Sequence, residues 1–158
     1  MSRTVERILG AHPFLAGMPP GTVALVAGCA RLATFEPGEL LTAEGEPADT
    51  LLLVHLGRVA VEAHRPAGGD LWIETAGPGH LVGLSWAAPP FRWQFDARAL
   101  EPVSAVAVDV RRLRAELGRH PDIGFALLDR MTERLVDRLQ STRTRLLDLH
   151  DLGHGAAH

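Results

Sequence analysis

From residue 31 to residue 110 the sequence is a series of short, strand-like runs, each bounded by glycine or proline. Pro37 and Gly38 stand together in one such boundary; proline fixes φ and glycine accepts a positive φ, which is what a type II turn requires. Short strands separated by turn signals at this spacing are typical of an antiparallel barrel or jelly roll. The runs cover residues 32–35, 39–42, 50–56, 58–63, 71–75, 95–100 and 103–108.

Helical patterns flank this central part on both sides. Residues 1–30 predict short helices broken by proline and glycine, and residues 31–110 form the barrel. Residues 111–150 predict a short helix followed by a long one, and residues 151–158 a flexible tail that contains two glycines. We therefore expect an α+β fold that is mainly β: a jelly-roll or β-roll barrel flanked by N-terminal helices and a long C-terminal helix.

The long helix, expected over residues 121–148, carries an apolar seam. Its apolar residues recur at steps of three and four, a spacing typical of coiled coils. A helix of about 27 residues is about 40 Å long, more than one small barrel covers. We expect a homodimer formed through this helix; the alternative is a seam that packs only on its own barrel. The seam consists of Leu128, Met131, Leu135, Leu139, Leu146 and Leu149, with Thr142 among them.

Composition restricts the class of protein. The chain has 158 residues and a formal net charge of −3, so we expect a single domain without the basic field that favours nucleic acid. The N-terminus does not resemble a signal peptide, and no run approaches the length of a membrane span. The one cysteine, Cys29, excludes an internal disulfide and suits a reducing compartment. These features predict a cytoplasmic protein.

Neither an enzyme nor a metal protein is expected. His55, His64 and His80 are scattered through the strand-rich part, and no spacing joins a nucleophile to a base. The C-terminal histidines at 150, 154 and 158 lie four residues apart, but the glycines between them argue against the helix that would align them on a metal.

The segment from residue 83 to residue 95 is rich in aromatic residues. It holds two of the three tryptophans, two of the five phenylalanines and a single arginine, Arg92. Tryptophan and arginine seldom lie in a connection without a partner, because one seeks an apolar surface and the other an anion. This composition favours a small-molecule site.

Several motifs, in order, resemble the cyclic-nucleotide-binding domain of the catabolite-activator (Crp/Fnr) family. They are the sequences at 35–39, 44–49, 56–59 and 77–83, which look like successive glycine-containing turns of the family's β-roll. The resemblance covers residues 12–150. It implies a regulatory domain that binds a cyclic nucleotide, cyclic AMP or a related anion, and it places the phosphate-binding cassette at residues 79–98.

The resemblance also implies the site residues. Gly83 begins the cassette, whose short helix offers free N–H groups to an anion, and Arg92 is the candidate phosphate ligand; the alternative is that Arg92 stacks on a tryptophan. Leu84 stands where the family has a ribose-binding glutamate, and Ser85 is a weaker substitute. Trp93 stands where the family has its arginine, one residue after Arg92.

On the long helix, Thr142 is the candidate base contact, with Arg143 beside it. The alternative is that Thr142 is a tolerated polar residue in the seam. Because few residues follow the long helix, we expect a stand-alone module without the family's helix-turn-helix domain, and no direct DNA binding. Such a module signals through its dimer or a protein partner. The other hypothesis is a degenerate fold that serves as an interaction or assembly module and binds no ligand.

Overall fold

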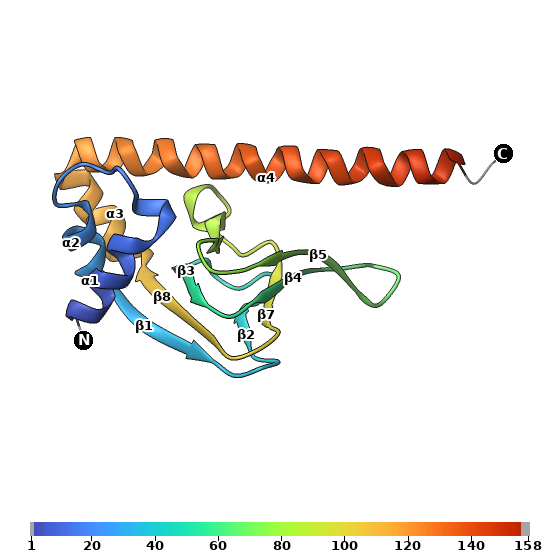
Figure 1. Ribbon diagram of the computed structural model, residues 1–158, viewed down its shortest axis with the longest axis horizontal. Helices are drawn as coiled ribbons and strands as arrows, with labels where there is room; N and C mark the ends of the chain where they lie inside the picture. Colours follow the sequence, from blue (N-terminus) through green and yellow to red (C-terminus); the bar gives the residue numbers. More distant parts are fainter. Residues whose placement is uncertain (1, 156–158) are drawn as a thin grey trace.

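The computed structural model describes residues 2–155, in which two antiparallel sheets are packed together and short helices gather at one end (Figure 1). The longest helix, α4, runs along one side of the roll and continues beyond it (Figure 1). The helical elements are α1 (Ser2–Ala11), η1 (Pro13–Leu15), α2 (Thr22–Ala27), η2 (Leu84–Ala87), α3 (Val110–Arg119) and α4 (Pro121–Gly155). The strands are β1 (Ala30–Phe35), β2 (Leu40–Thr42), β3 (Thr50–Leu56), β4 (Val59–His64), β5 (Asp70–Ala76), β6 (Leu81–Val82), β7 (Asp96–Ala99) and β8 (Val103–Asp109).

The strand order confirms the expected jelly roll. One sheet has the order β1-β8-β3-β6 and the other β2-β7-β4-β5, and all pairs are antiparallel. Each of the seven strand-like runs is a strand in the structure. The sequence did not predict β6, because its two residues are too few to show a period.

Strand β3 explains where the core lies. Leu51 and Leu53 face the helices, whereas Leu52 and Val54 face the second sheet, so both faces of the strand are buried. A strand buried on both faces reads as a continuous apolar run rather than an alternating one, as residues 51–54 do. Its partner β8 has the same arrangement with smaller residues between the sheets.

Helix α4 is fixed to the N-terminal segment by one arginine. The guanidinium of Arg130 donates hydrogen bonds to three carbonyl oxygens: Pro13 at 3.1 Å, Phe14 at 2.8 Å and Ala16 at 2.7 Å. The charged donor strengthens these bonds. They hold the first half of α4 in one position relative to η1.

The C-terminal part of α4 differs from the expectation. We expected the helix to end near residue 148 and a flexible tail over residues 151–158, but α4 continues to Gly155, and residues 156–158 lie outside the described part. Each glycine costs about 1 kcal/mol in a helix, but no proline interrupts the hydrogen-bond ladder here. The ring of His154 also bonds the carbonyl oxygen of His150, at 3.0 Å.

The apolar seam of α4 divides into two parts. Near its start, Met131 is buried against the protein's own core, as is Leu127 beside the seam, whereas Leu128, the first residue of the seam, is 53% exposed. Beyond Met131, Leu135 is partly covered, at 44% exposed, and the seam from Leu139 onward is largely exposed within this chain, with Leu139 at 67% and Leu149 at 66%. The chain's own roll therefore covers only the first part of the seam.

A charged cluster joins the β4–β5 hairpin to β7. His64 Nδ1 lies 2.6 Å from an oxygen of Asp70, and His64 Nε2 lies 2.9 Å from the buried carboxylate of Asp96. Glu44 lies further away, at 3.8 Å from Nε2. The hydrogen bond to Asp70 and then the charge of Asp96 raise the pKa of His64 above its usual value.

This cluster predicts a pH-dependent contribution to stability. Because the pKa of His64 is higher in the folded than in the unfolded chain, its contribution is complete below the unfolded pKa, about 6.5, and is lost as pH rises through the folded value. We expect the wild type to lose more stability than His64→Gln between pH 6 and pH 8, measured by urea unfolding. His12, whose pKa is lowered by burial, contributes to stability with the opposite pH dependence. Because His12 is present in both proteins, its contribution cancels when the stability of His64→Gln is subtracted from that of the wild type. Equal pH dependences would contradict the prediction.

Candidate ligand-binding site

A pocket of about 260 Å³ lies between the 83–95 segment, the inner face of one sheet and α4. We call it the cassette pocket. The segment contributes Leu84, Ser85 and Trp93, the sheet contributes Val61 among others, and α4 closes the pocket with Leu135 and Arg138. Of the seven sequence-predicted site residues, the structure brings four together here: Gly83, Leu84, Ser85 and Trp93.

Gly83 allows the backbone to pass close to β3. Its φ is +96°, and an added Cβ would lie 2.9 Å from the carbonyl oxygen of Thr50 and 3.2 Å from Trp93 Nε1. A side chain at this position would meet both the strained φ and the nearby backbone. Glycine therefore sets the start of η2 and the narrow approach between the segment and β3.

The side chains that follow Gly83 are mostly apolar. Leu84 is buried and belongs to the core beneath the helices, although it also lines the cassette pocket. Ser85 is half-buried and supplies a hydroxyl to the pocket. Among residues 2–155, no acidic side chain lines the pocket, so a ligand hydroxyl group finds no carboxylate among them to donate to.

Arg92 and Trp93 face opposite sides of the segment. Residues 91–93 pair with the 44–48 turn: Trp93 N donates to the Glu46 oxygen at 3.0 Å, and Gly45 N to the Trp93 oxygen at 2.9 Å. In an extended segment, neighbouring side chains point in opposite directions. Arg92 is accordingly exposed and donates to the Gly45 oxygen at 2.7 Å, while Trp93 lines the pocket.

The indole of Trp93 brings an unused donor to the site. Its Nε1 atom is buried and has no hydrogen-bond partner within residues 2–155. A buried donor without an acceptor costs about 1–3 kcal/mol. A ligand that placed an acceptor near Trp93 would remove this cost.

Arg138 is the arginine that lines the pocket, and sequence reasoning missed it. Its Nε lies 3.1 Å from a carboxylate oxygen of Glu74 on β5, and its Nη2 donates to the Leu81 oxygen at 3.4 Å. The ion pair joins α4 to the roll at the edge of the pocket. Arg138 precedes Thr142 by four residues and so shares its helix face, which is the sequence signal that points to it.

Thr142 and Arg143 do not reach the pocket within this chain. Thr142 is exposed, and its hydroxyl donates to the Arg138 carbonyl oxygen at 2.9 Å. Arg143 is also exposed. Both lie on α4 beyond the part that closes the pocket, so their roles as base contacts stay predictions.

Residues 2–155 contain neither a candidate metal cluster nor a membrane-spanning helix. In this part of the chain, no group of three or more His, Cys, Asp or Glu side chains could hold a metal ion. None of its helices is long and apolar enough to cross a membrane.

The β-roll, the short helix after Gly83 and α4 together enclose the cassette pocket. The chain belongs to the cyclic nucleotide-binding domain family, whose model matches residues 32–120. This family consists of regulatory domains and not of enzymes, in agreement with the sequence expectation.

Relatives agree with this assignment. The chain is 28% identical over 145 residues to the CRP-like cAMP-activated global transcriptional regulator of Mycobacterium tuberculosis, covering 92% of this chain and 63% of that protein. It thus spans under two thirds of the length of its characterised relatives. Among solved structures, a cyclic nucleotide-binding domain from Methylobacillus flagellatus has a TM-score of 0.78, 21% identity and coverage of 92% and 82%. The N-terminal domain of a transcriptional regulator from Streptomyces coelicolor has a TM-score of 0.69, 26% identity and coverage of 83% and 94%.

The orientation of Trp93 predicts how a phosphate-binding site could be built in this pocket. Trp93→Arg places a guanidinium on the pocket side of the segment, so we expect cyclic AMP to bind at least about tenfold more tightly than to the wild type, as one charge-assisted hydrogen bond allows. Calorimetry measures the change, and thermal unfolding checks the fold. Arg92→Ala is the control, because its side chain points away from the pocket; a larger effect there than at Trp93 would contradict the assignment.

Proposed function

We propose that this chain is a ligand-responsive regulatory domain that binds a cyclic nucleotide in the cassette pocket, with cyclic AMP the first candidate, and that signals through α4. The observation that carries the proposal is the position of the pocket: the 83–95 segment forms one wall and α4 another. A ligand between them contacts both, and its binding energy can therefore depend on where α4 lies.

The pair formed by Arg138 and Glu74 offers a way to transmit binding. It links α4 to β5 beside the pocket, and both side chains are partly exposed, at 32% and 22%. A ligand acceptor that draws Arg138 into the pocket weakens its bond to Glu74. The helix then exchanges one contact with the roll for another with the ligand, which is the differential interaction that a shift between two states requires.

The chemistry of the pocket favours altered specificity. At the positions where the resemblance implies a glutamate and an arginine, this chain has Leu84 and Trp93, which offer an apolar surface and an indole N–H. Arg138, which also lines the pocket, is already paired with Glu74. An anion buried without a counter-charge is strongly disfavoured. We therefore propose that the heterocyclic part of the ligand provides much of the affinity, by packing on the apolar walls.

Calorimetric titration with cyclic AMP, cyclic GMP, adenosine and guanosine tests the ligand. We expect binding of at least one, with a cyclic phosphate contributing less than about tenfold over its nucleoside. Tryptophan fluorescence is a second measurement, because Trp93 lines the pocket whereas Trp72, 58% exposed, and the buried Trp86 are not among its lining residues. Trp93→Phe identifies the part of the signal that comes from the pocket.

The second candidate is an assembly module that binds no ligand. The burial of Leu84 in the core and the small size of the cassette pocket favour it. Absence of heat and of a fluorescence change with all four compounds would support this candidate over the sensor.

We also propose that two copies of the chain pair through the exposed seam of α4. The seam continues beyond the roll at steps of three and four, and large apolar side chains on it are 44–71% exposed. A second α4 supplies an apolar surface of matching length, as in coiled coils. Pairing would also bring Thr142 and Arg143 close to the partner's roll.

Charged substitutions in the seam test this pairing. Leu139→Glu with Leu146→Glu should convert a dimer to a monomer in analytical ultracentrifugation, without lowering the melting temperature of the roll by more than a few degrees. Leu56→Glu with Leu71→Glu is the matched control, since those leucines are 57% and 49% exposed on the roll. A monomeric wild type, or a dimer that survives the seam substitutions, would exclude the proposed interface.

A further inference from the structure

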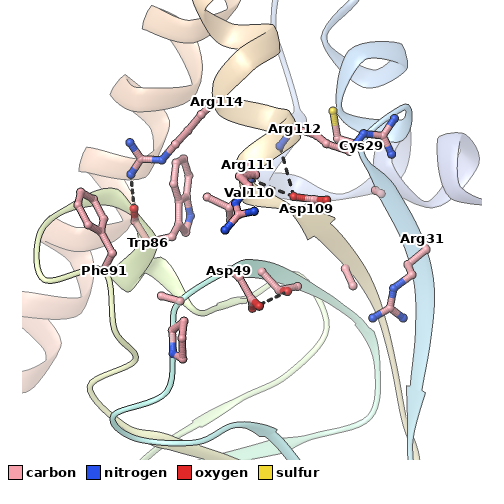
Figure 2. Close-up of a pocket in the computed structure, with 15 residues that line it drawn as sticks. Cys29, Arg31, Asp49, Trp86, Phe91, Asp109, Val110, Arg111, Arg112 and Arg114 are labelled. Carbon is pink, nitrogen blue, oxygen red and sulfur yellow. Dashed lines mark hydrogen bonds between the residues drawn. The ribbon is translucent and has the colours of Figure 1, made fainter.

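A second cavity lies on the other side of the 83–95 segment, away from the cassette pocket. Its volume is about 780 Å³, within the range of small-molecule sites. Trp86 and Phe91 form one wall, the 47–50 loop forms the floor, and the start of α3 lies opposite (Figure 2). We call this cavity the arginine cleft, after Arg31, Arg111, Arg112 and Arg114, which line it.

The cleft is positively charged although the whole chain carries −3. Its four arginines are accompanied by only two acidic residues, Asp49 and Asp109. Asp109 already accepts hydrogen bonds from the backbone N–H groups of Arg111 and Arg112 as the cap of α3, and Asp49 accepts from the hydroxyl of Thr50. The local field therefore favours an anion.

Three of the four guanidinium groups in the cleft are free to bind an anion. Within residues 2–155, the side chains of Arg31, Arg111 and Arg112 make no hydrogen bond or ion pair with the protein. Arginine matches the geometry of phosphate oxygens because its planar fork donates two parallel hydrogen bonds. An anion in the cleft would thus not have to displace existing partners.

Trp86 supplies an independent observation that points to a ligand. The side chain is 3% exposed, and its Nε1 is buried without a hydrogen-bond partner in the described chain. In Figure 2 the nitrogen end of the indole is drawn on the side of Val110 and Arg111, which also line the cleft. A native protein seldom leaves such a donor unpaired, so an acceptor is missing on this side.

The aromatic wall suits a flat group next to the anion. Arg114 is held between two rings, 5.1 Å from the centre of Trp86 and 4.9 Å from that of Phe91, and it donates to the Trp86 carbonyl oxygen. Phe91 is 43% exposed and has a φ of +57°, a conformation that costs a non-glycine residue energy and is frequent at functional sites. Its exposed ring offers a surface on which a heterocycle can stack.

We propose that the arginine cleft binds an aromatic phosphate of the size of a nucleoside 5′-monophosphate, at a site separate from the cassette pocket. Arg111, whose side chain is drawn on the Trp86 side of the cleft in Figure 2, binds the phosphate, and Phe91 stacks on the ring of the ligand. The Trp86 N–H donates to an acceptor on the ligand. Arg112, drawn beside Cys29, adds positive charge to the cleft.

Titration calorimetry with AMP, adenosine and inorganic phosphate tests the proposal on the whole chain. We expect AMP to bind more tightly than either of its parts. Arg111→Ala with Arg112→Ala should weaken AMP binding at least about tenfold. Arg3→Ala with Arg7→Ala makes the same change in net charge on exposed α1 positions outside the cleft, and it should leave AMP affinity within about twofold.

Trp86→Phe separates binding from stability. It removes the unpaired N–H, so AMP affinity should fall several-fold. The melting temperature also falls, because the smaller ring leaves a cavity in the core. A lowered melting temperature with unchanged AMP affinity would show that Trp86 only packs. Equal AMP affinity in the two double-arginine variants would overturn the site.

Ser85→Phe distinguishes this site from the cassette pocket. The substitution adds a ring to the wall of that pocket, and AMP binding in the cleft should persist. If AMP binding is lost in Ser85→Phe and retained in the Arg111 and Arg112 variant, AMP occupies the cassette pocket and the arginine cleft is not its site.

Discussion

The burial of β3 on both faces is the constraint on which the rest of the structure depends. Through Leu52 and Val54 it packs against the second sheet, and through Leu51 and Leu53 it supports the helices. The first residue of β3 also fixes the position of the 83–95 segment. A side chain at position 83 would collide with the carbonyl oxygen of Thr50, so only glycine allows this close approach. One strand thus joins the two cores and positions the backbone of the site.

The segment after Gly83 separates two cavities of different chemistry. On one side lies the small cassette pocket, with apolar walls and an indole N–H from Trp93. On the other side lies the larger arginine cleft, with Trp86 in its wall. Alternation along residues 91–93 contributes to this separation, because it turns Trp93 into the pocket and Arg92 away from it.

Sequence reasoning predicted the fold well because its signals are local. Glycine and proline mark the turns, and the runs between them have the length of strands, so only the two-residue β6 escaped notice. The end of α4 was harder to predict, since glycine weakens a helix without ending it.

In the site, Arg92 and Trp93 are neighbours, and the sequence does not tell which of two adjacent side chains faces inward. That depends on the pairing of residues 91–93 with the 44–48 turn, which is a long-range contact. Arg138 was missed for a related reason: its distance from the roll is set by the path of α4.

Because α4 is long and is anchored near one end, a small tilt at the anchor moves its other end much further. Its 35 residues span about 52 Å, and Arg130 fixes its first half to η1. The helix therefore behaves as a lever whose pivot lies near the roll. Arg138 lies about 12 Å along the helix from Arg130, and the far end of the helix lies about 38 Å from Arg130. A displacement of about 1 Å at Arg138 therefore tilts the helix by about 5° and moves its far end by about 3 Å. Under the proposed signalling through α4, small rearrangements at the pocket would be enlarged in this way at the far end of the helix.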